Sequence, residues 1–368
     1  MSIAPRIDVA APPLPLIRPK EIKSLQAARG IAALLVVICH SAAFLGEESG
    51  LWHRTPLYLW FRGTVLGVQM FFVISGVVIF RAHREDFNQP QKTGIFYWKR
   101  FRRIYPLYWI CLTPTLWKHH AATDLHASYP HLPSVVVSSY LLLHLFSYQT
   151  IMVQAWTLFD EIQFYLAFSL CILNRRVGFV VLGVWLAASF LFLAPASPYW
   201  LVVFSPYHLL FGLGILVALA LESEKRIPAG LIFWLGMIVF AGALVVAGPF
   251  HRGVIVRLIA GVGAACILLG AALLERRSLL IVPRWLTLLG DASYSIYLIH
   301  FMVISAIARL AYAHWSHLPI PIGGWMLLFI LLGVGAGLAT HYAIERPLLR
   351  ALGKKSIGGI LSPKVARR

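Results

Sequence analysis

Long apolar stretches recur along almost the whole chain, and they restrict the fold more than any other feature of the sequence. A helix needs about 20 mainly apolar residues to cross the ~30 Å hydrocarbon core of a bilayer. Of the 368 residues, 59% are hydrophobic and 12% are charged, against roughly 25% charged in soluble domains. We predict an all-α polytopic membrane protein with about ten transmembrane helices, at residues 25–45, 63–80, 104–118, 156–173, 177–194, 201–221, 229–248, 253–274, 285–310 and 322–344.

The basic residues predict the orientation of these helices. Loops on the cytoplasmic side of a membrane are enriched in Lys and Arg. The chain has 32 Lys and Arg against 14 Asp and Glu, and a cytoplasmic N-terminus places 26 of the 32 on the inner side. The basic excess is therefore mostly a topology signal, and we expect no nucleic-acid partner. Both termini are predicted to be cytoplasmic, in a bacterial inner membrane.

An eleventh apolar stretch, residues 134–150, tests this topology. If it crossed the membrane, every later loop would change sides and the inner excess of basic residues would be lost. We therefore interpret it as a re-entrant or surface helix within an outer segment, 119–155. The predicted organisation is a basic cytoplasmic tail at 1–24, a membrane domain at 25–348 and a second basic tail at 349–368.

A basic and aromatic segment directly precedes the third predicted span. It contains Arg100 and Arg103, together with Lys99 and Arg102, interleaved with aromatic residues. This pattern is typical of an interfacial amphipathic helix. Two roles remain open, which are anchoring to anionic lipid and binding of phosphate groups by the guanidinium groups.

Ionisable residues inside the predicted spans mark candidate functional sites, because such residues are costly in a bilayer. Arg29 and His40 both lie in the first span. Their spacing of eleven residues puts them on one helix face, about 16 Å apart along the axis. A histidine there could act as a general base. The alternative is a hydrogen-bonded core histidine with a topology-determining arginine.

The fourth span opens with Trp156, followed by two carboxylates, Asp160 and Glu161. These carboxylates could bind sugar hydroxyl groups, support a histidine, or be ordinary charges near a helix N-terminus. Trp156 could contact a carbohydrate or belong to the aromatic belt at the membrane interface.

The ninth span is unusually polar, with Asp291, Ser293, Tyr294 and His300. We expect such a helix to line an internal cavity rather than to face lipid. The outer segment holds a further group of polar residues whose spacing fits no usual metal site, so no metal is predicted. This group consists of His119, His120, Asp124, His126 and His131.

Six sequence blocks, in order, resemble the membrane-bound acyltransferase 3 family, in particular members that acetylate exopolysaccharides. The first and second blocks are Arg29 with His40, and Phe71 to Gly76, which contains Ser75. The remaining blocks are Arg100 to Pro106, Trp156 to Tyr165, Leu289 to His300 and Ile344 to Leu348. One departure is Ile162, where many relatives have a second acidic residue, and this weakens any scheme that needs paired carboxylates there.

The resemblance implies ten spans and an acyl-CoA donor, most often acetyl-CoA, used from the cytoplasm as a co-substrate without a tightly bound cofactor. It implies catalytic roles for His40 and Glu161, and donor binding by Arg29, Arg100 and Arg103. The acceptor implied is a sugar hydroxyl of an exopolysaccharide or lipid-linked glycan, and membrane lipids surround the protein. We expect the acceptor site or channel to include Ser75, Trp156, Asp160, Asp291, Ser293, Tyr294 and His300.

The chemistry of the first span leaves two routes open. His40 either deprotonates the acceptor hydroxyl or carries the acyl group covalently. Ser75, Ser293 and Tyr294 are candidates for stabilising the oxyanion. A glycan or proton-coupled transporter using His40 and Glu161 is the competing function, although no internal repeat of the kind common in transporters is found. A membrane glycosyltransferase is a weaker rival, because its first outer loop offers only Glu47 and Glu48.

Overall fold

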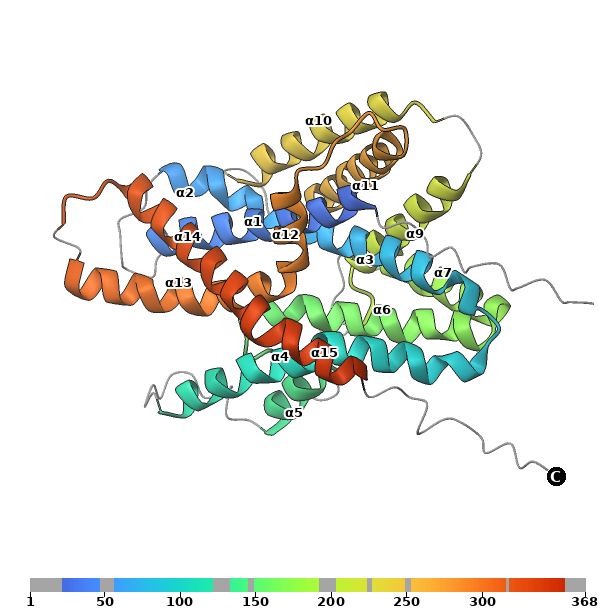
Figure 1. Ribbon diagram of the computed structural model, residues 1–368, viewed down its shortest axis with the longest axis horizontal. Coiled ribbons are helices and arrows are strands. Elements are labelled where there is room, and N and C mark those ends of the chain that lie inside the picture. Colours follow the sequence, from blue (N-terminus) through green and yellow to red (C-terminus); the bar gives the residue numbers. More distant parts are fainter. Residues whose placement is uncertain are drawn as a thin grey trace, which may run out of the picture.

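A computed structural model describes residues 22–46, 56–121, 133–144, 149–191, 203–223, 227–248, 253–315 and 318–354. These residues are mostly helical, and no strand occurs among them. Figure 1 shows the helices gathered into one bundle. The longer helices are α1 (Lys23–Gly46), α3 (Gly67–His83), α4 (Thr93–Ala121), α6 (Trp156–Leu173), α7 (Arg175–Leu191), α9 (His208–Glu222), α10 (Ala229–Ala247), α11 (Val254–Arg276), α13 (Ser293–Trp315) and α14 (Ile322–Thr340). The short ones are α2 (Pro56–Phe61), α5 (Pro133–Leu141), α12 (Arg284–Asp291) and α15 (Arg346–Lys354).

A long helix lies at each of the ten predicted spans, and seven segments of the described chain are long and apolar enough to cross a membrane. The other three are α4, α7 and α9, which are either shorter or carry several basic residues. α4 is long, but Arg100, Arg102 and Arg103 lie within it. The all-helical, multi-span class is thus confirmed, and the count of ten crossings stays a prediction.

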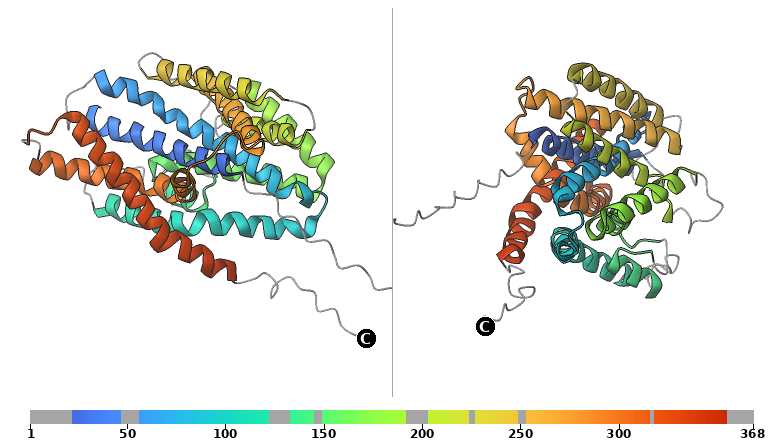
Figure 2. Two further views of the ribbon diagram at one scale, coloured as in Figure 1. Left: turned by 45° about the horizontal axis from the view of Figure 1, so that its top comes forward. Right: turned by 90° about the vertical axis from the view of Figure 1, so that its right-hand side faces the viewer.

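The ninth span is not the continuous helix that we predicted for 285–310. The chain forms α12, breaks at Ala292, and begins α13 at Ser293. In Figure 2, α12 is seen nearly end-on while most other helices lie in the plane of the view, so it crosses the bundle. Tight packing explains the break, because a Cβ atom added to Gly290 would lie only 1.9 Å from the carbonyl oxygen of Gln26 on α1. Asp291 therefore ends a short crosswise helix and is not within a span.

The segment predicted to be re-entrant or surface-bound contains only the short helix α5 in its described part. Nine residues rise about 13 Å, which is less than half the hydrocarbon thickness. α5 is tied to α4, because Tyr108 donates a hydrogen bond to the Ser139 carbonyl (2.9 Å) and Trp109 donates one to the Tyr140 carbonyl (3.0 Å). Residues 145–148 lie outside the described residues, and the interpretation that 134–150 does not cross stays a prediction.

Glycines set the closest helix contacts around the middle of the bundle. A Cβ atom at Gly76 on α3 would lie 2.2 Å from the Phe211 carbonyl oxygen on α9, and one at Gly337 on α14 would lie 2.5 Å from the Ile296 Cα on α13. Small residues allow this close approach in membrane helices. Gly76 directly follows Ser75, so the same contact fixes the position of that hydroxyl group.

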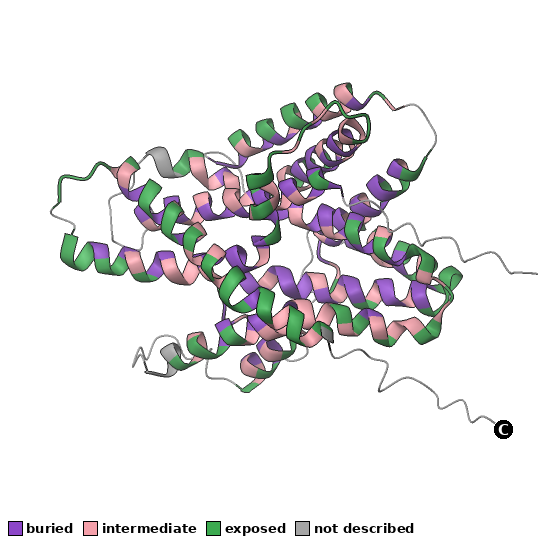
Figure 3. Ribbon diagram, in the orientation of Figure 1, coloured by how far each residue is buried: buried purple, intermediate pink, exposed green. Residues whose placement is uncertain are grey.

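Burial separates the helices into inner and peripheral ones (Figure 3). In the apolar part of the segment that contains α3, 72% of residues are buried, against 22% in α10 and 28% in the segment that contains α14. An apolar helix with so much exposed surface suits contact with lipid. The central helices α1, α3, α6 and α13 carry the polar residues considered below.

Candidate active site

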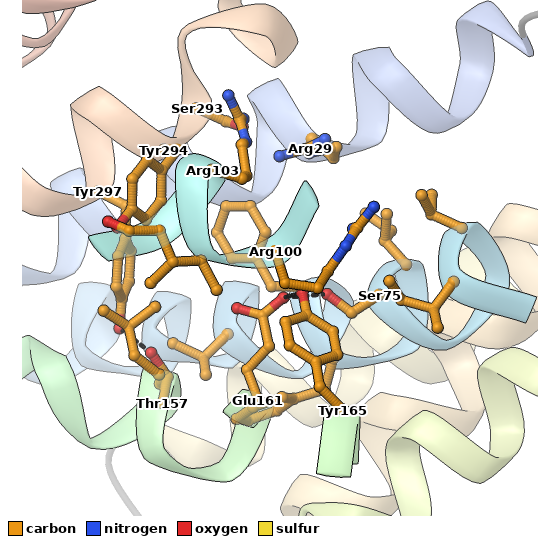
Figure 4. A pocket seen from close by; sticks show the side chains of 18 residues that line it. Arg29, Ser75, Arg100, Arg103, Thr157, Glu161, Tyr165, Ser293, Tyr294 and Tyr297 are labelled. Carbon is orange, nitrogen blue, oxygen red and sulfur yellow. Dashed lines mark hydrogen bonds between the residues drawn. The ribbon is translucent and has the colours of Figure 1, made fainter. Parts of the chain in front are cut away.

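A cavity opens among five helices, α1, α3, α4, α6 and α13, and it gathers most of the predicted site residues. Its space, including the part open at the mouth, is about 850 Å³. Arg29, Ser75, Arg100, Arg103, Glu161, Ser293 and Tyr294 line it, as expected for residues that share a site. Thr157, Tyr165 and Tyr297 add further hydroxyl groups, and Figure 4 shows the labelled side chains around the cavity, with the Glu161 carboxylate beside Ser75 and Tyr165.

Two of the three arginines have guanidinium N–H donors that lack a hydrogen-bond partner among the described residues. Arg29 makes no hydrogen bond or ion pair with the described residues. The Nε atom of Arg100 is buried and has no hydrogen-bond partner among the same residues. The Arg100 guanidinium lies over the rings of Phe96 and Tyr165, 5.9 and 5.7 Å from their centroids. Buried donors without partners are costly, so the cavity is well suited to an anion.

Helix α1 is held at its N-terminus, which positions Arg29 one and a half turns further on. Both carboxylate oxygens of Glu275 on α11 accept backbone N–H groups, from Lys23 (2.9 Å) and from Ser24 (2.7 Å). The side chain of Gln26 also donates a hydrogen bond to Asp291. The first turn of a helix has unpaired N–H groups that favour such anionic partners.

Arg103 differs from the other two arginines because it is paired with Glu345. This carboxylate is only 2% exposed, and it also accepts a hydrogen bond from Ser295 (2.6 Å) and contacts Nδ1 of His341 (2.7 Å). Residues His341–Glu345 form a π-helical turn, and such turns are frequent at functional sites. Arg103 also lies 5.4 Å from the Tyr294 ring centroid. Its guanidinium is thus fixed on the cavity wall.

Glu161 is held by two hydroxyl groups. Ser75 on α3 donates to its Oε1 atom at 3.1 Å, and Tyr165, one helical turn further along α6, donates to the same atom. The carboxylate therefore faces the cavity with the three arginines. No hydrogen bond or ion pair links it to His40 within the described structure.

His40 instead pairs with His300. The Nδ1 atom of His40 lies 2.8 Å from Nε2 of His300, and the two rings are stacked with centroids 5.1 Å apart. His300 is fully buried, and its Nδ1 atom lies 2.9 Å from the carbonyl oxygen of Ile296. Both histidines were predicted site residues, but their direct contact was not predicted.

These contacts define the tautomers of the histidine pair. A carbonyl oxygen only accepts hydrogen bonds, so Nδ1 of His300 carries its proton and Nε2 of His300 is the acceptor. Nδ1 of His40 must then be the donor. The remaining nitrogen, Nε2 of His40, is unprotonated and makes no hydrogen bond to the described part of the chain. This is the form that a general base requires.

The histidine pair lies beyond one end of the cavity. Tyr297 lines the cavity, and its ring centroid is 6.1 Å from that of His300. Phe71, which also lines the cavity, packs edge-on against Tyr297 at 5.9 Å. Tyr297 is held by hydrogen bonds to Thr157 and to the Gln154 carbonyl, each 2.8 Å long. His40 is therefore turned towards the protein interior, behind an aromatic pair.

Four predicted acceptor or channel residues are not among those that line this cavity, namely His300, described above, and Trp156, Asp160 and Asp291. Asp160 precedes Glu161 on α6, so the two side chains point about 100° apart around the helix. The Asp160 carboxylate pairs with His208 (3.4 Å) and Ser205 (3.4 Å). Trp156 packs against Tyr207 with centroids 4.9 Å apart. Asp291 is exposed at the end of α12. Their predicted roles in the acceptor site remain predictions.

The three candidates for oxyanion stabilisation differ in how their hydroxyl groups are used. Ser75 donates to Glu161, and Tyr294 donates to the Ile104 carbonyl (2.7 Å). The buried hydroxyl of Ser293 lines the cavity and has no hydrogen-bond partner in the described part of the chain. Ser293 is thus the candidate whose donor is unused.

The sequence analysis assigned no specific role to several residues of this site, chiefly Tyr165, Tyr297 and Glu345. Tyr165 could have been found, because it lies four residues after Glu161 and so on the same helix face. Glu345 could have been singled out as a lone carboxylate at the inner end of an apolar span. No group of three metal-ligating side chains occurs among the described residues, and the histidine side chains considered at 119–131 fall outside them.

Comparison with known proteins decides the family. The chain matches the family profile described as an acyltransferase domain over residues 22–342. It belongs to this acyltransferase family. As an acyltransferase with several apolar helices, it is a multi-pass membrane protein.

Two curated relatives cover most of the chain. The exopolysaccharide production protein ExoZ of Rhizobium meliloti (strain 1021) is 30% identical over 308 residues, covering 77% of this chain and 89% of the relative. The acyltransferase MdmB of Streptomyces mycarofaciens is 28% identical over 393 residues, covering 91% and 93%. No solved structure gives a significant match.

Proposed function

We propose that this acyltransferase transfers an acyl group, most often acetyl, from cytoplasmic acyl-CoA to a sugar hydroxyl of an exopolysaccharide or another lipid-linked or surface glycan. It would act in a bacterial inner membrane with ten spans and both termini in the cytoplasm. The likeness to a relative named for exopolysaccharide production supports a carbohydrate acceptor.

The unused donors of Arg29 and Arg100 in one cavity carry the donor half of this proposal. Acyl-CoA is rich in phosphate, and arginine is the side chain best matched to phosphate oxygens. Arg103 completes a row of three cations from α1 and α4. The phosphates would be held here while the thioester points towards Tyr297 and the histidine pair.

In the direct route, Nε2 of His40 accepts the proton of the acceptor hydroxyl. The alkoxide oxygen bonds to the thioester carbon, and the carbon–sulfur bond breaks. The CoA thiolate leaves and takes up the proton from the His40 imidazolium. His300 holds Nδ1 of His40 throughout, which keeps the reactive nitrogen free.

In the covalent route, Nε2 of His40 bonds to the acyl carbon while the carbon–sulfur bond breaks, and CoA leaves as the thiolate. The acceptor oxygen then bonds to the acyl carbon, the bond from that carbon to Nε2 breaks, and the freed Nε2 takes up the hydroxyl proton, which finally passes to the thiolate. The two routes differ in an observable way. Single-turnover quenching that traps an acylated His40 supports the covalent route, whereas a ternary complex formed before any CoA release supports the direct one.

The proposal is tested by comparing surface glycans from cells with and without the gene. Loss of a mass equal to one acyl group per repeat is expected, and the mass identifies the group. Purified protein in lipid nanodiscs should then transfer label from acyl-CoA to the de-acylated glycan. Unchanged glycans together with no acyl-CoA binding would reject the enzyme and favour the competing transporter.

The proposed topology is tested by the side from which engineered tags are reached. A tag in residues 119–134 should be reached from outside intact cells, and one in residues 222–226 only after the membrane is opened. The reverse labelling would overturn the orientation assigned from the basic residues.

A further inference from the structure

The outer ends of the spans carry few basic residues, so those that occur there call for an explanation other than topology. Arg257 lies in the first turn of α11, at the end assigned to the outer face by the proposed topology. It is half-buried rather than turned into lipid. Arg309, near the outer end of α13, is exposed and is a useful contrast.

Arg257 joins two aromatic side chains from other helices. Its guanidinium donates a hydrogen bond to the hydroxyl of Tyr207 and lies 5.7 Å from the centre of that ring. The Tyr207 ring packs against Trp156 at the start of α6, with centroids 4.9 Å apart. All three side chains are partly exposed. We name Trp156, Tyr207 and Arg257 the outer platform.

The charge of Arg257 is not neutralised by the described part of the protein. No carboxylate there lies within ion-pair distance of it, and its hydrogen bond to Tyr207 uses one of five N–H donors. Asp160 is a nearby acidic group, but its two oxygens face His208 and Ser205. His208 itself is fully buried under the Trp185 ring, 4.0 Å away.

The outer platform and the arginine-lined cavity share one side chain. Phe72 lines the cavity, and its ring also packs on Tyr207 (5.4 Å) and on Trp156 (6.0 Å). A molecule resting on the outer platform would therefore be separated from the cavity by the thickness of one aromatic ring.

We propose that the outer platform binds the acceptor and selects a glycan that carries an anionic group beside the ring to be stacked. Aromatic faces pack on the apolar faces of sugars, and a guanidinium pairs in a fork with a carboxylate or a phosphate. The anion is either a carboxylate on a sugar or the diphosphate of a lipid carrier. This inference rests on the proposed function, because it names the class of its acceptor.

The test measures equilibrium binding of three probes to the full-length protein in nanodiscs. The first is a glucuronic-acid-containing oligosaccharide on a polyprenyl diphosphate. The second is the same molecule with its carboxyl group reduced to the alcohol, and the third is the acidic oligosaccharide released from the lipid. Arg257→Gln is compared with Arg309→Gln, and Arg257→Lys serves as a variant that keeps the charge but loses the fork.

Arg257→Gln is expected to weaken binding about tenfold or more, since hydrogen bonds to charged groups are the strong ones. Arg257→Lys should lie between wild type and Arg257→Gln, and Arg309→Gln should match wild type. If the loss disappears with the reduced probe, the anion is the carboxylate. If it disappears with the released probe, the anion is the diphosphate. Trp156→Ala should weaken binding of all three probes alike.

The inference is overturned if wild type binds none of the probes, or if Arg257→Gln binds all of them as Arg309→Gln does. Acyl-CoA binding, measured on the same samples, separates this from failure of the proposed function. A wild-type protein that binds acyl-CoA and transfers label to a neutral glycan, with no effect of Arg257→Gln, keeps the function and loses the anionic acceptor.

Discussion

The arginine-lined cavity and the histidine pair share helices α1 and α13, but the cavity is lined by charged side chains and the histidine pair is held by uncharged groups. The cavity holds three guanidinium groups against the carboxylates of Glu161 and Glu345, and two of the arginines keep unused donors. No charged side chain among the described residues pairs with either histidine, and a chain of hydrogen bonds to a carbonyl oxygen fixes two neutral rings.

One helical bundle thus separates donor binding from proton transfer. A charged site suits a polyanionic donor, but strong fields beside a base would also change its protonation. Placing His40 about 16 Å along α1 from Arg29, behind Phe71 and Tyr297, keeps the two tasks apart. Substitutions in the two regions should therefore affect different kinetic constants.

The largest effect is expected for His40→Ala. Loss of a general base or nucleophile should lower kcat about a thousandfold, while the KM for acyl-CoA stays within a factor of about two. The measurement is label transfer by purified protein at saturating donor. His314→Ala removes an exposed histidine of α13 and is the matched control. A kcat for His40→Ala within about threefold of wild type would contradict the assigned role.

The double variant Arg100→Gln, Arg103→Gln should impair binding of the donor rather than proton transfer. Removing two charge-assisted contacts is expected to raise the KM for acyl-CoA about a hundredfold, with acceptor KM nearly unchanged. Arg102→Gln, from the same basic segment but not lining the cavity, is the control. A larger change in acceptor KM than in donor KM would remove these arginines from the donor site.

His300 offers a finer test, because one substitution keeps its accepting atom and another does not. His300→Gln retains an oxygen near the position of Nε2, so it should hold the His40 tautomer better than His300→Ala. We expect kcat to fall about tenfold or more in His300→Ala and less in His300→Gln, with donor KM unchanged in both. Equal losses in the two variants would show that His300 only fills space.

Tyr165→Phe should have the smallest effect. It removes one of the two hydroxyl groups that hold Glu161, and Ser75 remains. A rise of about threefold in donor KM, without a change in kcat, is expected for one hydrogen bond among several. Tyr140→Phe removes a hydroxyl bonded to Thr113 on the far side of α4 and is the control. A fall in kcat alone would place Tyr165 in the chemistry instead.

The helices and the membership of the cavity were largely predictable from the sequence. Spans follow from apolar length, and ionisable residues such as Arg29 and Glu161 stand out because a bilayer penalises them. Helical periodicity also separates Asp160 from Glu161, since neighbours on a helix point about 100° apart. The same reasoning would have added Tyr165.

The pairings and the break in the ninth span were not predictable in the same way. His40 and His300 are 260 residues apart, and Arg103 and Glu345 are 242 apart, so only packing brings them together. The break at Ala292 has no proline to announce it. It depends on the contact of Gly290 with α1, which is a tertiary feature.

The π-helical turn at His341–Glu345 determines how this site responds to the insertion or deletion of a residue. A π turn is an α-helix that has taken in an extra residue, so its register is as important as its composition. Deleting the extra residue would restore a regular helix and leave Glu345 on the same face, but inserting one residue into the regular part of α14 would swing that carboxylate about 100° around the axis, away from Arg103 and Ser295. Gain of a single codon in that part of the helix would thus undo the wall of the cavity while every side chain that builds it was still encoded.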